Sequence, residues 1–361
     1  MNYTLIKGTF HVIGYSPDGD SMMFKAENPA LWAQIYTENR PMFDEKLNAE
    51  GGAVQLRLQA IDALETHYTP EPLATPAELK GKEKPEIVKP VPTGHKQPAE
   101  IGKQATEAFM RFMGVQKSQW KTFGRNTWVE KVSLGQQEGK DVWLTKKQTE
   151  NLPGYIVAAD MERNGRPLSW VFAGAPSLPD GATLNKDQLA AILDKSVNYH
   201  LLKQGLVYPY FFMTLAGKLR DKLLEAVKQA QTAAQKPGKP PAGLTKVPNV
   251  WMHDKTAQGV KIATFKQITD EMEVSPYLFR KLIKSHYAQN MADYWEALKT
   301  GTAFSCDPNA EAINITRFFS DGNPWVFIIC DQDFVRLDEV VALKDGMLKM
   351  TRPVSEFVFL S

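Results

Sequence analysis

The stretch AVQLRLQAIDALE, residues 53–65, constrains the fold more than any other part of the chain. Apolar and polar side chains alternate from Val54 to Ala60, with Arg57 on the polar side of the pattern. A period of two is typical of a β-strand that buries one face and exposes the other. The pattern therefore predicts a sheet packed on a core.

The residues before this stretch are also predicted to be β-structure. Thr9–Tyr15 is rich in β-branched and aromatic side chains, and Ser21–Lys25 has extended character. Asp18-Gly19 lies between them and has the chemistry of a turn. Residues 1–68 are thus expected to be strands joined by turns.

A polar segment follows between Thr69 and Glu100. It contains seven prolines and many lysines and glutamates, with almost no aromatic residues. Such a composition buries too little apolar surface to offset its ordering entropy. We expect a loop or an extended tether, with its lysines balanced by glutamates.

Further along the chain, helical spacing of apolar residues alternates with hairpin signals. The glycine pair Gly135 and Gly139 predicts one hairpin, and Asn164-Gly165 predicts a type I′ turn in a second. The helix SVNYHLLKQGL is expected to end at Gly205. Helices are expected at residues 102–113, 197–206 and 218–235, and hairpins at residues 127–145 and 155–168.

A second run of proline, lysine and glycine ends at Pro248, where we place a domain boundary. Residues 249–361 are expected to form a smaller α+β domain, with a helix that begins at Ser275-Pro276. The first domain, residues 1–248, then carries insertions near residues 69–100 and 174–194.

Composition limits the classes of function only weakly. The formal net charge is +2, so any nucleic-acid contact must depend on local basic groups. Cys306 and Cys330 could pair, but reduced thiols are the favoured interpretation. The chain lacks a signal-peptide pattern and an apolar stretch long enough to span a membrane, so a soluble, cytoplasmic protein is expected.

Three acids and one arginine stand at the ends of neighbouring predicted strands. Asp20 follows the first turn, and Asp62 and Glu65 come after the strand that carries Arg57. Asp62 does not share the parity of Arg57, so the strand must end or bend if the two are to meet. Each signal alone is typical of a surface turn or a solvated strand residue.

Together, these groups suit phosphodiester chemistry. A hard cation such as Ca²⁺ takes carboxylate, carbonyl and water oxygens. A further carboxylate can orient or deprotonate the attacking water, and a guanidinium can grip phosphate oxygens with two hydrogen bonds.

The order of these elements resembles the staphylococcal nuclease-like (thermonuclease) family. RLQAIDALE is the most specific element, and the resemblance covers roughly residues 5–251, interrupted by the two insertions. The elements that match in order are Asp18-Gly19-Asp20-Ser21, Arg57 through Glu65, residues 102–113, Tyr155–Leu168, Val197–Leu206 and the helix from Lys218, with Trp251 near its end.

The resemblance implies an OB-like five-stranded barrel with flanking helices, and Ca²⁺-dependent hydrolysis of DNA or RNA by an endonuclease. Asp20 and Asp62 would be metal ligands beside the carbonyl of Ala63. Glu65 would be the general base, and Arg57 would bind the phosphate. Asp18 would support the ligands without touching the cation. Another divalent cation could take the place of Ca²⁺.

One departure from the family pattern concerns a second arginine, which usually precedes the YIYAD-like strand. Here the equivalent position falls near Asn151, which cannot donate a charge-assisted pair of hydrogen bonds. Losing one donor of this kind costs about 100- to 1000-fold in rate. Arg125, Lys146 or Lys147 could supply the missing charge, but nothing in the spacing shows it.

Two hypotheses follow. The first is a metal-dependent nuclease that acts on DNA or RNA, with no membrane contact. The second is a catalytically weak or inactive module that keeps the barrel, binds nucleic acid or protein, and uses residues 249–361 to recruit a partner. The retained acids and Arg57 favour the enzyme, whereas Asn151 favours the binding module.

Overall fold

A computed structural model describes the chain as two compact units. Unit 1 consists of residues 1–63 and 103–249, and unit 2 of residues 64–102 and 250–361. The structure describes residues 2–84, 86–89, 91–92, 94–124, 126–146, 150, 152–236, 238–306, 318–319 and 322–360. The expectations for Asn151, Arg125 and Lys147 fall outside these residues.

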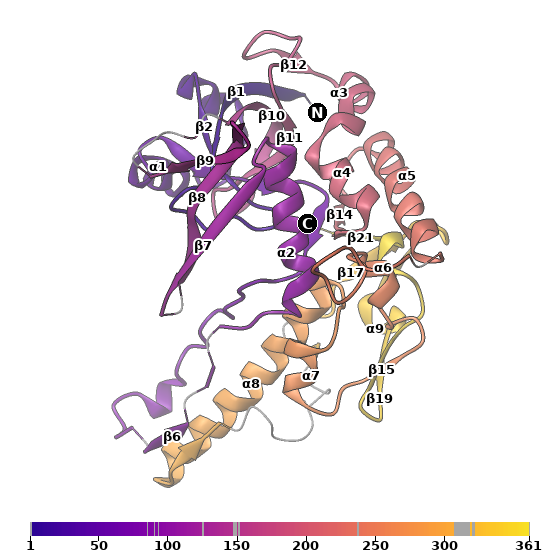
Figure 1. The fold of residues 1–361 in the computed structure, drawn as a ribbon. Coiled ribbons are helices and arrows are strands. Elements are labelled where there is room, and N and C mark those ends of the chain that lie inside the picture. The colour runs from indigo at the N-terminus through magenta and orange to yellow at the C-terminus, as the bar shows by residue number, and fades with distance from the viewer. Residues whose placement is uncertain are drawn as a thin grey trace. The chain divides into compact units, whose positions relative to one another are not determined.

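The main sheet of unit 1 has seven strands and curls into a half-barrel (Figure 1). Its strands are β1 (Tyr3–His11), β2 (Met23–Ala26), β3 (Ala53–Gln55), β4 (Arg57–Leu58), β10 (Leu152–Met161), β11 (Pro167–Ala173) and β12 (Thr183–Leu184). The order is β3, β2, β1, β10, β11, β4, with β12 beside β1. β11 and β4 pair in parallel and the other neighbours are antiparallel. The predicted α+β class is therefore confirmed.

The alternating stretch that opened the sequence forms β3 and β4, which are separated only by Leu56. The backbone N–H groups of Leu56 and Leu58 continue the ladder by donating to the carbonyl oxygens of Met22 and Asp20. After Leu58 the chain turns through Ala60, whose φ is +66°. It then enters β5 (Ile61–Ala63), which pairs with β13 (Val207–Pro209). The strand thus breaks between Arg57 and Asp62, as their different parity required.

A second sheet of unit 1 consists of β7 (Lys117–Phe123), β8 (Asn126–Gln137) and β9 (Lys140–Thr145). We call it the ribbon, because β7 and β8 extend as a long two-stranded arm (Figure 1). β8 and β9 form the hairpin predicted from Gly135 and Gly139, whereas β7 was not predicted from the sequence.

The hairpin predicted at Asn164-Gly165 joins β10 to β11, but its turn is not type I′. That turn needs positive φ at both central residues, and only Gly165 has it, at +74°. The N–H of Glu162 donates to the carbonyl of Arg166, so three residues form the loop. Such loops combine an ordinary turn with one left-handed residue.

Helices cover unit 1 beside the sheets. They are α1 (Arg40–Ala49), α2 (Ala99–Phe112, which begins in unit 2), α3 (Lys186–Ile192), α4 (Val197–Gln204) and α5 (Gly217–Ala234), with 3₁₀ turns η1 (Pro29–Gln34) and η3 (Leu193–Lys195). Gly205 ends α4 in the left-handed conformation, as predicted. Asn198 of α4 is fully buried, accepts from Val171 N–H and donates to the carbonyls of Gln59 and Ser169. This side chain ties α4 to β11 and to the turn after β4.

Unit 2 contains the proline-rich segment and the C-terminal residues. Its longest helix, α8, runs from Pro276 to Thr300 with proline at its start, as predicted. The other elements are η2 (Ala77–Leu79), β6 (Ile87–Lys89), α6 (Val250–His253), β15 (Val260–Lys261), α7 (Phe265–Asp270), β16 (Phe304–Ser305), β17 (Trp325–Ile328), β18 (Asp333–Arg336), α9 (Leu337–Val340), β19 (Val341–Lys344), β20 (Met347–Met350), η5 (Val354–Glu356) and β21 (Phe357–Phe359). Whereas the sequence treated residues 69–100 as an insertion in the first domain, the compact units group residues 64–102 with the C-terminal part.

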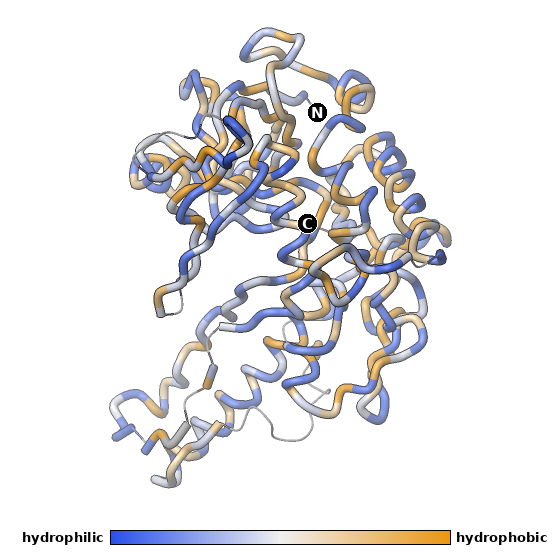
Figure 2. Tube along the Cα trace, viewed as in Figure 1, coloured by the Kyte–Doolittle hydropathy of each residue, from blue (hydrophilic) through white to orange (hydrophobic). Residues whose placement is uncertain are grey.

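Three small sheets lie in unit 2: β15-β20-β19, β16-β6 and β21-β17-β18. Hydrophobic and hydrophilic residues alternate along α5 and α8 in Figure 2. In the described part of the chain, no helix combines the length and the hydrophobicity that crossing a membrane requires.

Candidate functional site

The turn at Asp18-Gly19-Asp20-Ser21 is a closed backbone loop. Asp18 and Ser21 exchange N–H to carbonyl hydrogen bonds of 3.0 and 3.3 Å, and Asp18 Oδ1 accepts from Gly19 N–H at 2.8 Å. A Cβ on Gly19 would come within 2.7 Å of Ala105 Cβ and 2.8 Å of Ala63 Cβ. Only glycine lets the turn lie this close to α2 and β5, so the position of Asp20 is fixed by packing.

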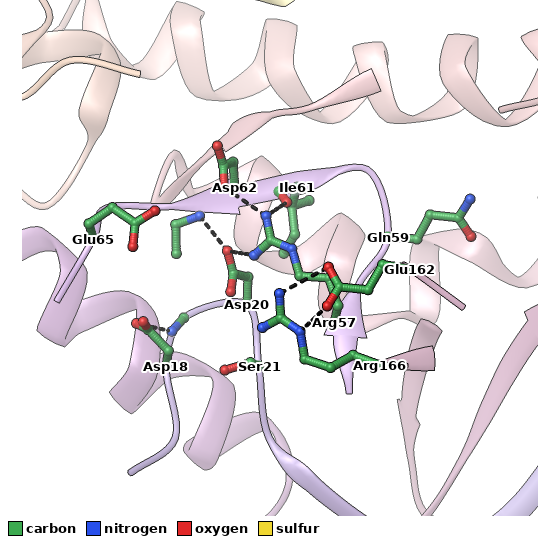
Figure 3. Close-up of polar contacts among 12 residues, drawn as sticks. Asp18, Asp20, Ser21, Arg57, Gln59, Ile61, Asp62, Glu65, Glu162 and Arg166 are labelled. Atoms are coloured by element: carbon green, nitrogen blue, oxygen red, sulfur yellow. Dashed lines mark hydrogen bonds and ion pairs between the residues drawn. The ribbon is translucent and has the colours of Figure 1, made fainter. Parts of the chain in front are cut away.

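Arg57 joins Asp20 to Asp62 (Figure 3). Its Nη1 pairs with Asp20 Oδ2, and its Nη2 donates to Asp62 Oδ1 at 2.7 Å. Asp20 Oδ2 also accepts from Ala63 N–H at 2.9 Å, and Arg57 Nη2 donates to the Ile61 carbonyl at 3.3 Å. We call Asp20, Arg57 and Asp62 the acid cluster.

The acid cluster is largely shielded from water. Asp20 is 7% and Asp62 2% exposed, and the Arg57 side chain is 14% exposed. Two carboxylates and one guanidinium leave a formal charge of −1. Burying this charge is costly unless each group is paired, which explains why the acids share one arginine.

Glu65 is part of unit 2, two residues beyond Ala63 in the chain. Arg280 of α8 donates from Nη1 to Glu65 Oε1 at 2.6 Å. The Glu65 backbone N–H donates to Gln97 Oε1, and Gln97 Nε2 donates to the Val274 carbonyl. Glu65 is therefore anchored by its side chain and its backbone, and neither Arg280 nor Gln97 could be found from sequence spacing.

The donor types of the acid cluster fit a hard divalent cation. Asp20 and Asp62 are 42 positions apart in the sequence and both provide carboxylate oxygens, of which Arg57 uses one from each. In the described residues, no group of three or more acids, histidines and cysteines is placed to hold a metal ion. The cluster thus offers two protein ligands, and water would have to complete the coordination.

Of the three basic residues considered as substitutes for a second arginine, Lys146 is the one that the structure describes. Lys146 lies beside Gly14, and the described contacts include no hydrogen bond or ion pair from it to the acid cluster.

Arg166 stands two residues before Leu168, the partner of Arg57 across the parallel pair β11–β4. It forms two hydrogen bonds with Glu162, one of them 3.0 Å long from Nη2 to Oε2 (Figure 3). Sequence reasoning did not single out Arg166 or Glu162.

Comparison with protein-family models gives no match, and comparison with curated proteins gives none either. The functional argument therefore depends on the geometry of the chain.

Proposed function

We propose that the chain is a metal-dependent nuclease that hydrolyses phosphodiester bonds of DNA or RNA. One observation carries the proposal: Asp20 and Asp62, from separate segments, converge on the guanidinium of Arg57 with little exposure to water. Arginine is over-represented where carboxylates and phosphates are bound by two parallel hydrogen bonds, and carboxylate oxygens are the ligands that hard cations prefer.

In this proposal Asp20 and Asp62 would hold a divalent cation such as Ca²⁺, with the Ala63 carbonyl as a further oxygen ligand. A bound cation offsets phosphate charge and lowers the pKa of a bound water. Arg57 exchanges its carboxylate partners for phosphate oxygens, to which its planar donors are matched. Glu65 accepts the proton of the attacking water, and Asp18 stabilises the turn that carries Asp20.

An OB-like barrel is part of the same proposal. The pairings run from β1 to β2 and β3, across Leu56 to β4, then to β11, β10 and back to β1. This circular path, with one parallel pair, supports a five-stranded barrel of the kind that grips nucleic acid.

A second function, a binding module without catalysis, is favoured by a different observation. Each acid of the proposed site already has an arginine partner: Arg57 binds Asp20 and Asp62, and Arg280 binds Glu65. Carboxylates that pair with arginines within the chain are also typical of structural ion pairs. A protein partner for residues 249–361 remains a prediction.

The test combines cation binding with cleavage. Calorimetry measures Ca²⁺ and Mg²⁺ binding to the full chain and to Asp20→Asn, Asp62→Asn and Glu65→Gln variants. Cleavage of single-stranded DNA, duplex DNA and RNA is followed with each cation and with chelator. The matched control is Asp187→Asn, because Asp187 is an exposed acid that pairs with Lys218.

The nuclease proposal expects cation binding to fall in both aspartate variants but not in Asp187→Asn. It expects cleavage to fall by about 100-fold or more in Glu65→Gln with cation binding retained. Nucleic-acid binding without cleavage, unchanged in all three variants, would overturn the nuclease and leave the binding module.

A further inference from the structure

Residues 117–145, which form the ribbon, bring basic and aromatic side chains together. They contain five basic and three acidic side chains, a net charge of +2, which equals that of the whole chain. They also hold three of the eight tryptophans, together with Phe123. A local excess of basic groups next to aromatic rings is the composition expected of a nucleic-acid contact.

The strand register divides these side chains between two faces. Partners across the ladder share a face, so Lys121 lies with Trp128, and Gln119 with Lys131. The same face continues through Lys117 and Ser133 to Trp143 of β9. We call this the basic face of the ribbon.

The opposite face of the ribbon packs on unit 1. Val129 and Val132 lie on it and are fully buried, and Val129 forms a bridge with Ile13. Trp120 shares this face and donates from its indole N–H to Ser118 Oγ at 3.1 Å. Packing on unit 1 therefore accounts for the two valines on this side of the ribbon.

The rings of the basic face are accompanied by cations and differ in exposure, since Trp128 and Trp143 are only partly exposed. Phe123 is 79% exposed at the end of β7. Lys131 Nζ lies 5.0 Å from the centre of the Trp143 ring. Lys121 pairs with Glu130 at 3.4 Å, with both side chains about half exposed. Exposed pairs of this kind contribute little, so Lys121 can exchange its carboxylate for a phosphate.

A hollow of about 360 Å³ lies where the basic face meets α2. Arg111, Lys117, Gln119 and Trp143 are among the residues that line it, with Glu107 as the one acid. The volume is within the range of sites for small ligands such as one nucleotide unit. Arg111 adds a guanidinium from the helix to the lysines of the strands.

We propose that the basic face of the ribbon binds single-stranded nucleic acid. Bases stack on Phe123, Trp128 and Trp143, while Lys121, Lys131 and Arg111 contact phosphates. Exposed rings of this kind need unstacked bases, which a duplex does not offer. The proposal rests on the proposed function only for the choice of nucleic acid as the ligand, and it names single strands as the preferred form.

The experiment measures binding in the presence of chelator, so that no cation or turnover is needed. The probes are a labelled oligothymidylate and an oligouridylate, each of about 15 nucleotides, which suits a surface of this kind. A duplex of the same length is the comparison. Fluorescence anisotropy is followed over a range of salt concentrations for Phe123→Ala, Lys121→Ala and Lys131→Ala in the full chain.

The matched controls lie in unit 1 outside the ribbon: Tyr36→Ala, an aromatic residue that is 62% exposed, and Lys228→Ala, an exposed lysine of α5. Phe123→Ala is expected to weaken single-strand binding by roughly 5- to 100-fold. Each lysine variant is expected to reduce the slope of log K against log salt by about 0.7. The controls should leave both quantities unchanged.

Unchanged binding in the ribbon variants, or a duplex that binds as tightly as single strands, would overturn the proposal. If the chain cleaves nucleic acid and the ribbon variants bind it as tightly as the native chain does, the nuclease proposal stands and the ribbon surface is refuted. Binding through the ribbon without any cleavage would keep the surface and refute the nuclease. Trp128→Phe, which retains a ring, serves as the conservative variant and should bind nearly as well as the native chain.

Discussion

Arg57 and Asp62, five positions apart, are joined by a 2.7 Å hydrogen bond across a break in the strand. In an unbroken strand, residues of opposite parity project to opposite faces and would not meet. The left-handed backbone at Ala60 reorients the chain so that Asp62 reaches the guanidinium. The bend is therefore what creates the acid cluster.

Loss of the Arg57 charge should destabilise the protein strongly. In Arg57→Leu, two buried carboxylates remain without their common partner, and the expected loss is about 3 kcal/mol or more in the free energy of unfolding. Urea unfolding followed by fluorescence measures it. Arg166→Leu is the control, since its partly buried pair with Glu162 involves one acid and its loss leaves only that acid without a partner, so the cost should be clearly smaller. Equal losses in the two variants would contradict a special role for Arg57.

Glu65 and Arg280 allow structural and catalytic roles to be separated. A double-mutant cycle with Glu65→Gln and Arg280→Gln should give a coupling of about 1–2 kcal/mol, because both side chains are mostly buried. If Glu65 is the general base, Glu65→Gln loses cleavage by about 100-fold or more while Arg280→Gln retains it within several-fold. Parallel losses of cleavage and stability in both variants would show that the pair is only structural.

A methyl group at Gly19 should disturb the turn that carries Asp20. The new Cβ would lie 2.7 Å from Ala105 Cβ, which is too close for contact without a backbone shift. Overpacking of this size typically costs about 1–3 kcal/mol. The control is Gly135→Ala, because a Cβ there meets nothing within 4 Å and the backbone has no positive φ. Thermal unfolding should separate the two variants clearly.

Acid should destabilise unit 2 through His286. Burial lowers the pKa of His286 from 6.5 to about 4, and the ring stacks on Phe265 at 4.2 Å. Between these pH values the unfolded chain binds a proton that the folded chain does not. Stability is therefore complete above pH 6.5 and declines as the pH falls toward 4, by up to about 3 kcal/mol.

Burial also lowers the pKa of His95, which adds to the effect in the same direction. Unfolding temperatures measured across this range test the prediction. His286→Phe keeps the stacked ring and should flatten the pH dependence. A pH dependence that is the same in His286→Phe and in the native chain would contradict the role of His286.

Sequence patterns predicted the elements whose signals are local. Alternation identified the strand with Arg57, Gly205 marked the end of α4, and Pro276 marked the start of α8. These succeeded because a period of two, a left-handed cap and a proline at the first turn each depend on a few neighbouring residues. The turn at Asn164-Gly165 was wrong in type because a three-residue loop uses the same glycine differently.

Long-range pairings could not be predicted in this way. Arg280 lies 215 positions from Glu65, and no sequence periodicity connects Glu65 to the helix that carries Arg280. The sharing of Arg57 by two acids was also hidden, because Asp62 has the opposite parity to Arg57 and Asp20 comes from another segment. Both are decided by tertiary packing and by the electrostatic need to pair buried charges.

The division of unit 2 into two distant segments has a consequence for synthesis. Residues 64–102 leave the ribosome roughly ten seconds or more before residue 250, at ordinary elongation rates. Unit 1 can therefore complete its folding before α8 of unit 2 has been synthesised. During this delay, an unfolded segment with exposed apolar side chains would be prone to aggregate. The many prolines and charges between Thr69 and Glu100 reduce that tendency.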